Sequence, residues 1–279
     1  MADTAFQTRY RDEFIAGFEV RSSYLRGAVT TEHQPKGNSA VFLVADSGGA
    51  TAKTRGVNGL IGSRANNLTQ TTVTLAEWHD LVRVTDFNVF ASQGNQSTIM
   101  QQGTMSVINR KVDADIIAAL DTATVTAGAA ATASLAMVVR AKVILGNAGV
   151  DLEEQDNLFG LISHAFDGYL MQIPAYTSAD YVEVKLLSGA FKRYKRWAGV
   201  NWIIHPSVTA VGTSDEKCYL FHRSALGHAI DTKSIESPVG YNEEQGYSWA
   251  RASVNMGSKL LQNSGVVRMR HDGSAYVGV

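Results

Sequence analysis

One long run of helical periodicity constrains this chain more than any other feature of its sequence. Between residues 95 and 121 apolar side chains recur every three or four residues. The stripe consists of Met105, Ile108, Val112, Ile116 and Leu120. About 26 residues at about 1.5 Å each make a rod of about 40 Å, longer than most globular helices. No internal repeat accompanies the rod, so we expect a spine, capped at Ser97, on which a sheet and another helix pack.

A glycine-rich stretch from Thr30 to Gln70 has a different character. It contains six glycines, many small polar residues and one short apolar run, Val41–Val44. A loop of about forty residues is unusual inside a compact domain and is commonly functional or held by a partner. We therefore expect a neighbouring subunit to order residues 37–70, by main-chain pairing with Val41–Val44 and by acidic groups that meet Arg55 and Arg64. The candidate interface residues are Val41, Phe42, Leu43, Lys53, Arg55 and Arg64.

The remaining periodicities predict a mixed α+β chain. Helices are expected at 4–20, 132–145, 165–172 and 224–232, the first with an aromatic side chain every fourth residue. Residues 71–90 read as β structure interrupted at 77–80, and further strands are expected at 181–187, 202–204, 266–269 and 275–277.

Composition limits the classes of function. Only 18% of the 279 residues are charged and the net charge is −1, which argues against a dedicated nucleic-acid binder and favours a subunit whose faces are covered by neighbours. The single cysteine, Cys218, excludes a disulfide framework. No secretory signal or membrane-spanning segment is visible, so a soluble cytoplasmic protein is the expectation.

Catalytic signatures are not found in the sequence. There is no phosphate-binding glycine loop, dinucleotide fingerprint or nucleophile elbow. Cys218 and His222 would share a helix face, but a zinc site needs two more ligands and only His228 is nearby. The acidic residues of 151–156 are interpreted as a solvated turn. We therefore expect no enzyme activity, cofactor or metal.

A basic and aromatic run lies between Lys185 and Trp197. Such a run can bind single-stranded nucleic acid through phosphates and stacking. The alternation of Phe191, Arg193, Lys195 and Trp197 equally suits an exposed strand with one charged edge, or a salt-bridging contact between subunits. The second interpretation is favoured.

Several segments together carry a family resemblance. They are TLAEWHDLVRVTDFNVFASQG at 74–94, the helix ending RKVDADIIAALDTAT, WAGVNWIIHP at 197–206, CYLFHRSALGHAID at 218–231, and residues 239–276. In this order they resemble the major capsid proteins of tailed bacteriophages with the Hong Kong 97-type fold. The resemblance implies an α+β fold with an N-arm at 1–30, an extended E-loop with its β return at 31–90 and a P-domain with the spine helix at 91–150. An A-domain at 151–255 and final strands returning to the P-domain at 256–279 complete it.

The same resemblance implies a structural function. The chain would assemble into hexamers and pentamers of an icosahedral shell around double-stranded DNA, and an encapsulin-like nanocompartment shell is the alternative. Scaffold, portal and possibly decoration proteins are the implied partners, with non-specific DNA contact at the inner face and no membrane. The implied location is the virion, after assembly in the host cytoplasm.

Some relatives link subunits covalently through a loop lysine. Lys53 is the one candidate in this loop, and we expect no cross-link.

Overall fold

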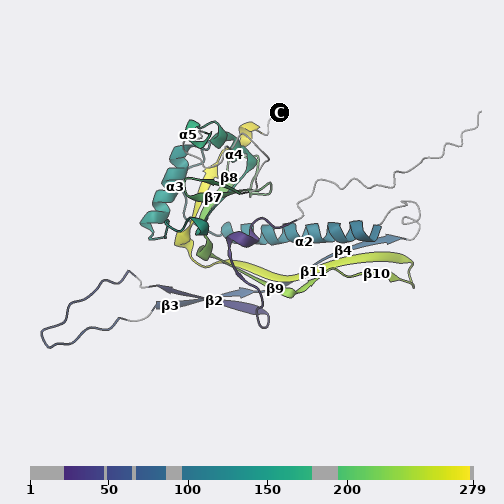
Figure 1. Ribbon diagram of the computed structural model, residues 1–279, viewed down its shortest axis with the longest axis horizontal. Helices are drawn as coiled ribbons and strands as arrows, with labels where there is room; N and C mark the ends of the chain where they lie inside the picture. The colour runs from purple at the N-terminus through teal and green to yellow at the C-terminus, as the bar shows by residue number, and fades with distance from the viewer. Residues whose placement is uncertain (1–21, 47–48, 65–66, 86–95, 178–193, 277–279) are drawn as a thin grey trace, which may run out of the picture.

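The protein has two lobes and a projecting hairpin (Figure 1). The computed structural model describes residues 22–46, 49–64, 67–85, 96–177 and 194–276. Each lobe contains one five-stranded sheet with helical cover, and the hairpin forms a separate two-stranded sheet. The first lobe is drawn out along the long helix, so the described chain is elongated.

The first lobe is a sheet with the long helix packed along it. Its strand order is β1-β9-β11-β10, with β4 on the other side of β11. The strands are β1 (Thr30–Glu32), β4 (Ala76–Thr85), β9 (Leu226–Glu236), β10 (Val239–Asn242) and β11 (Tyr247–Leu260). Helix α2 (Gln96–Leu120) contacts β11 along its length. Alternate β11 residues, Ala250, Ala252, Val254 and Met256, are buried, as one covered face of a sheet requires.

The second lobe is a mixed sheet of order β12-β8-β5-β7-β6, in which β5 and β7 are parallel. Its strands are β5 (Leu158–Ile162), β6 (Tyr194–Trp197), β7 (Val200–Ile204), β8 (Glu216–His222) and β12 (Val266–His271). Its helices are α3 (Leu135–Asn147), α4 (His164–Met171) and α5 (Pro174–Thr177). Trp202 is fully buried beside Gly160, where a Cβ atom would stand 2.4 Å from the indole ring, so a side chain there would collide with the core.

The hairpin joins β2 (Ser39–Asp46) to β3 (Asn67–Thr74) in antiparallel register, with Ser39 opposite Thr74 and Asp46 opposite Asn67. Between the strands, residues 49–64 contain a turn and otherwise no regular structure. Five short 3₁₀ helices complete the described elements. They are η1 (Arg26–Ala28), η2 (Gln155–Asn157), η3 (Arg223–Ala225), η4 (Asn263–Gly265) and η5 (Ser274–Tyr276).

Some of the predicted helices and strands are confirmed, and others are wrong. The spine, the second helix, the short helix at 165–172 and the strands at 202–204 and 266–269 are found close to their expected places. Ser97 lies inside the first turn of α2, so it is not the cap, and the break in the β return falls at Leu75 because residues 77–80 continue β4. Residues 275–277 were wrongly expected as a strand, since η5 covers Ser274–Tyr276. The predicted helix 4–20 and strand 181–187 lie outside the described residues.

The helix expected at 224–232 is wrong: η3 ends at Ala225, and the rest of the stretch is strand β9. Residues 225–230 are all buried because β9 is an inner strand, paired with β1 and β11 and covered by the hairpin base. A strand buried on both faces does not alternate apolar and polar residues, and the spacing of its apolar residues can then resemble that of a helix.

The division of the chain between the lobes also differs from expectation. Strands β9, β10 and β11 lie in the sheet that carries α2, whereas the resemblance places residues 151–255 in the A-domain. Conversely, β12 pairs with β8 and α3 packs on β12, so both belong to the second lobe. The chain passes between the two lobes several times, so the order of the elements in the sequence does not tell which lobe each strand belongs to.

Candidate assembly surfaces and the junction between the lobes

The hairpin is seated on the first sheet by its base. Ala40 and Val73 form a small buried cluster with Ala229 of β9, and Phe42 packs against this cluster. Gly257 of β11 makes the close approach possible, because a Cβ atom there would stand 2.3 Å from the carbonyl oxygen of Thr74. One hairpin face is therefore used for attachment within the chain.

The opposite hairpin face is apolar and open. Val41 and Leu43 are exposed on β2, as is Leu68 on β3, while Phe42 points to the sheet. Beyond the strands, residues 49–64 are all exposed, including Val57, Leu60 and Ile61 and the cations Lys53, Arg55 and Arg64. Val41–Val44 pair along one edge with Thr69–Thr72 of the same chain, so main-chain pairing with a neighbouring subunit would have to use the other edge of β2 and stays a prediction. As interface residues, the six candidates stay a prediction.

The spine helix buries the stripe that the sequence outlines. Ile108, Val112, Ile116 and Leu120 all lie in the main core, with Ile116 and Leu120 fully covered. The same face also carries a carboxylate, Asp113, that periodicity does not single out. A charged residue within a buried stripe is the signal that could have identified it, because buried charges are almost always paired.

Asp113 ties three parts of the chain together. Its Oδ1 accepts hydrogen bonds from the Ser23 hydroxyl (2.6 Å) and the Leu25 amide (3.0 Å), and the Tyr24 amide donates to the same carboxylate. Its Oδ2 lies 3.3 Å from Nε2 of His205, the first residue after β7. Since the Ser207 amide donates to His205 Nδ1, the ring hydrogen sits on Nε2 and points at Asp113. The carboxylate thus joins the segment before η1, the spine helix and the second lobe.

The pKa of Asp113 reflects this environment. Burial raises it, but the hydrogen bonds from His205, Ser23, Tyr24 and Leu25 outweigh burial and hold the pKa below its ordinary value of 3.8. The group is therefore a charged anchor at neutral pH.

A second carboxylate, Asp121, fastens the C-terminal end of the same helix. Its oxygens accept hydrogen bonds from the hydroxyls of Thr209 and Tyr219 in the second lobe. Arg268 of β12 donates to the backbone carbonyls of Asp121 and Ala123 (2.8 and 2.6 Å). Asp113 and Asp121 together set the orientation of the spine relative to the second sheet.

The basic run does not form an exposed charged edge where the structure describes it. Lys195 and Trp197 are buried in β6, and Lys195 Nζ lies 2.7 Å from Asp167 Oδ2, with both side chains only 4% exposed. The Tyr176 hydroxyl donates to the other Asp167 oxygen (2.9 Å), and burial together with this carboxylate raises the pKa of Tyr176. Arg196, which is exposed, pairs with Asp156 of the acidic turn. Lys185, Lys192 and Arg193 lie outside the described residues.

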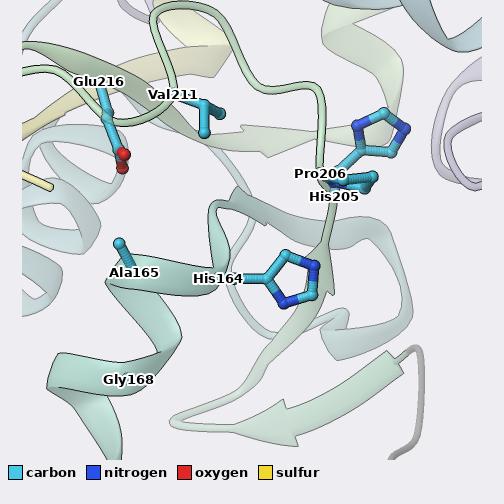
Figure 2. Close-up of a pocket in the computed structure, with 7 residues that line it drawn as sticks. All are labelled: His164, Ala165, Gly168, His205, Pro206, Val211 and Glu216. Atoms are coloured by element: carbon cyan, nitrogen blue, oxygen red, sulfur yellow. The ribbon is translucent and has the colours of Figure 1, made fainter. Parts of the chain in front are cut away.

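A cavity of about 270 Å³ lies at the carboxyl ends of β5 and β7, lined by His164, Ala165, Gly168, His205, Pro206, Val211 and Glu216. Figure 2 shows Glu216 and Val211 facing α4 across the space. The Glu216 carboxylate accepts from the Ser163 hydroxyl (2.5 Å) and the Gly212 amide (2.6 Å). Ser163 Oγ in turn accepts from the Phe166 amide, so this hydroxyl caps α4 and is held as a structural group.

Other candidate ligands are not brought together. Cys218 is buried on β8 and His222 is four residues further along the same strand, so the helical spacing considered for this pair does not apply. Within the described ranges, no three His, Cys, Asp or Glu side chains are grouped as a metal site would need. None of the helices described is long and apolar enough to span a membrane.

Comparison with known proteins gives one family and one fold. The model of the family described as "Phage capsid protein" matches residues 2–273. Among curated proteins none matches the chain. Solved structures do match: one described as "Mycobacterium phage Che8" has a TM-score of 0.74 at 16% identity, covering 96% of this chain and 98% of that one.

Two further structures resemble the chain at similar coverage. One is described as the capsid of a native GTA particle, with a TM-score of 0.72 at 13% identity and 96% coverage of both chains. The other is described as the capsid of Ralstonia phage GP4, with a TM-score of 0.68 at 12% identity, covering 97% of this chain and 96% of that one. At these identities the likeness establishes the fold.

Proposed function

The chain belongs to the phage capsid protein family and is a structural protein of the virion, and from this premise we propose that its copies form hexamers and pentamers of an icosahedral shell around double-stranded DNA. A closed shell needs a subunit with several different interfaces that repeat by symmetry. The projecting hairpin is the observation that carries the proposal, because it offers a contact surface well away from the body of the subunit.

The exposed composition of the hairpin supports this role. Exposed apolar side chains do not stabilise an isolated subunit. On the hairpin they are Val41, Leu43 and Leu68 on one face and Val57, Leu60 and Ile61 in the loop beyond it. Exposed apolar surface of this kind is typical of a contact with another protein. We assign the hairpin and residues 49–64 as the E-loop, the first lobe as the P-domain and the second lobe as the A-domain.

Further partners follow from the same role. A scaffold protein, a portal and decoration proteins would meet the shell, and packaged DNA would touch its inner face without sequence preference. The proposed role is architectural, with no reaction assigned, and assembly would take place in the host cytoplasm. No observation favours the nanocompartment alternative.

Negative-stain electron microscopy of the purified protein tests the proposal. Closed shells or capsomers with five- and six-fold symmetry are the expected particles. Monodisperse particles of about the subunit mass, 30.1 kDa, under conditions that range from low to high salt would contradict it.

A further inference from the structure

The outer side of helix α3 is apolar where a surface helix would normally be charged. Leu135, Val139 and Val143, spaced four residues apart, are 39%, 49% and 53% exposed. The side that packs on the sheet is formed by other residues, Val138, Ala141 and Leu145. A helix that is apolar on both sides is typically buried in the complete assembly.

Charge on α3 is scarce as well. The helix contains two charged residues, Arg140 and Lys142, and the Lys142 ammonium is turned back to the carbonyl of Ala198 (2.6 Å). The exposed stripe therefore offers almost no competing charge to an apolar partner.

An acidic turn continues this stripe at the C-terminal end of α3. Gly146 lies on the same side of the helix as Val139 and Val143, given about 100° per residue, and Leu152 packs against it, since a Cβ atom on Gly146 would stand 3.4 Å from the Leu152 side chain. The turn that Leu152 anchors exposes four carboxylates, Asp151, Glu153, Glu154 and Asp156. Of these, Asp156 pairs with Arg196.

A surface of opposite character lies elsewhere on the same molecule. Residues 49–64 contain Lys53, Arg55 and Arg64 and not a single carboxylate. Three exposed apolar residues, Val57, Leu60 and Ile61, lie between these cations. The loop is basic and apolar, whereas the α3 side of the second lobe is acidic and apolar.

We propose that the apolar stripe of α3 (Leu135, Val139 and Val143), with the acidic turn beside it, is the docking surface for residues 49–64 of a second copy of this chain. The loop would place its apolar residues on the stripe and its cations against the carboxylates. Because the two surfaces are different and lie on different parts of the subunit, the contact is heterologous and repeats from copy to copy around a ring. Opposite charge also fixes the register and disfavours stripe-to-stripe contacts. This inference rests on the proposed shell assembly.

Site-directed cross-linking tests the contact directly. Cys218, the single native cysteine, is buried, so introduced thiols can be addressed selectively. A Leu60→Cys/Val139→Cys variant, assembled and treated with a short bis-maleimide, should give a ladder of covalent multimers on a denaturing gel. Leu60→Cys/Arg140→Cys is the matched control, because position 140 is rotated about 100° around the helix, and it should give at least about tenfold less multimer.

Charge reversal provides a second, independent measurement. Glu153→Lys/Glu154→Lys and Lys53→Glu/Arg55→Glu should each lower the yield of shells by about tenfold or more, because each places like charges opposite one another. Combining all four changes should restore at least about half of the wild-type yield. Circular dichroism should show every variant folded, since these side chains are exposed in the subunit.

The outcomes separate the two proposals. If wild-type protein forms no particles under any condition, the shell assembly is wrong and the docking fails with it. If shells form but the position 139 and 140 variants cross-link equally, or neither cross-links, the docking alone is overturned. Shells that tolerate both charge reversals also overturn the docking.

Discussion

Asp113 Oδ2 lies 3.3 Å from His205 Nε2, and this contact joins the spine helix to the second lobe. Three donors from residues 23–25 bind the same carboxylate: the Ser23 hydroxyl and the amides of Tyr24 and Leu25. The ring of Tyr24 stands edge-on to His205 at 5.3 Å between centroids, so the segment before η1 closes over the junction. One buried side chain thereby determines how three separate stretches of the chain meet.

Replacing Asp113 with Ala should destabilise the isolated subunit by about 3 kcal/mol, because buried donors lose a charged acceptor. Urea unfolding of the unassembled protein at pH 7 measures this loss. Asp156→Ala, at an exposed pair, is the control and should change the free energy of unfolding by no more than about 0.5 kcal/mol.

The Asp113 contribution should also depend on pH. Its pKa is lower in the folded chain than the ordinary 3.8, so the carboxylate stabilises the fold above about pH 4. This stability is lost as the pH falls through the lowered folded pKa. The unfolding free energies of wild type and Asp113→Ala should therefore differ most at neutral pH, and the difference should shrink as the pH falls through the lowered folded pKa of Asp113. A constant difference across this range would contradict the assignment.

The spine face can be tested at Ile116, which is fully buried. Ile116→Asp puts an unpaired charge into the core, which costs several kcal/mol, and it should abolish soluble folded protein. Ala118→Asp, on the exposed side of the same helix, is the matched control and should cost less than about 1 kcal/mol. Normal shells from Ile116→Asp would mean that the helix face is assigned wrongly.

The Lys195–Asp167 pair should behave as a buried ion pair. Lys195→Met leaves the Asp167 carboxylate without its cation and should cost about 3–5 kcal/mol in unfolding experiments. Asp167→Asn/Lys195→Met should recover a large part of this loss, because a neutral amide can still accept from the Tyr176 hydroxyl. If Lys195→Met had the same free energy of unfolding as wild type, the Lys195–Asp167 contact would not be a buried ion pair.

Local patterns predict helices α2, α3 and α4 well, but they mistake strand β9 for a helix and do not predict which sheet each strand joins. The α2 stripe and the α3 periodicity arise within one element, so the sequence carries them directly. The placement of β9–β11 in the first lobe and of β12 in the second depends on strand pairs between residues far apart in the sequence, which local patterns do not reveal. Lys195 illustrates the same limit at a site: its burial depends on Asp167, 28 residues away along the chain. Asp113, by contrast, could have been suspected from its place in an apolar stripe.

The hairpin seat makes a further prediction at Gly257. An alanine Cβ would come within 2.3 Å of a backbone oxygen of Thr74, which cannot move aside as a flexible side chain could. Gly257→Ala should therefore cost about 1–3 kcal/mol and reduce the yield of shells, because the hairpin is displaced from the sheet. Gly103→Ala in α2 is the control: its Cβ meets nothing within 4 Å, and the variant should be as stable as wild type or more so. Equal assembly by the two variants would show that the hairpin seat does not matter.

Residues 49–64 should be cleavable in the free subunit and protected in the shell. Every residue of this stretch is exposed, and ordering a residue costs roughly 1–2 kcal/mol of conformational entropy. The three large apolar side chains of this stretch, Val57, Leu60 and Ile61, are mostly exposed in the subunit and bury too little surface to offset that cost, whereas contact with a neighbouring subunit can bury them. Brief trypsin treatment, with mapping of fragments by mass spectrometry, should therefore cut after Lys53, Arg55 or Arg64 in unassembled protein and much more slowly in shells.

The internal controls are Arg251 and Lys259, which are exposed but lie in strand β11. They should resist cleavage in both states, because their backbone is held in the sheet. Equal protection of 49–64 in free subunits and in shells would mean that this loop is an ordinary folded element with no part in assembly.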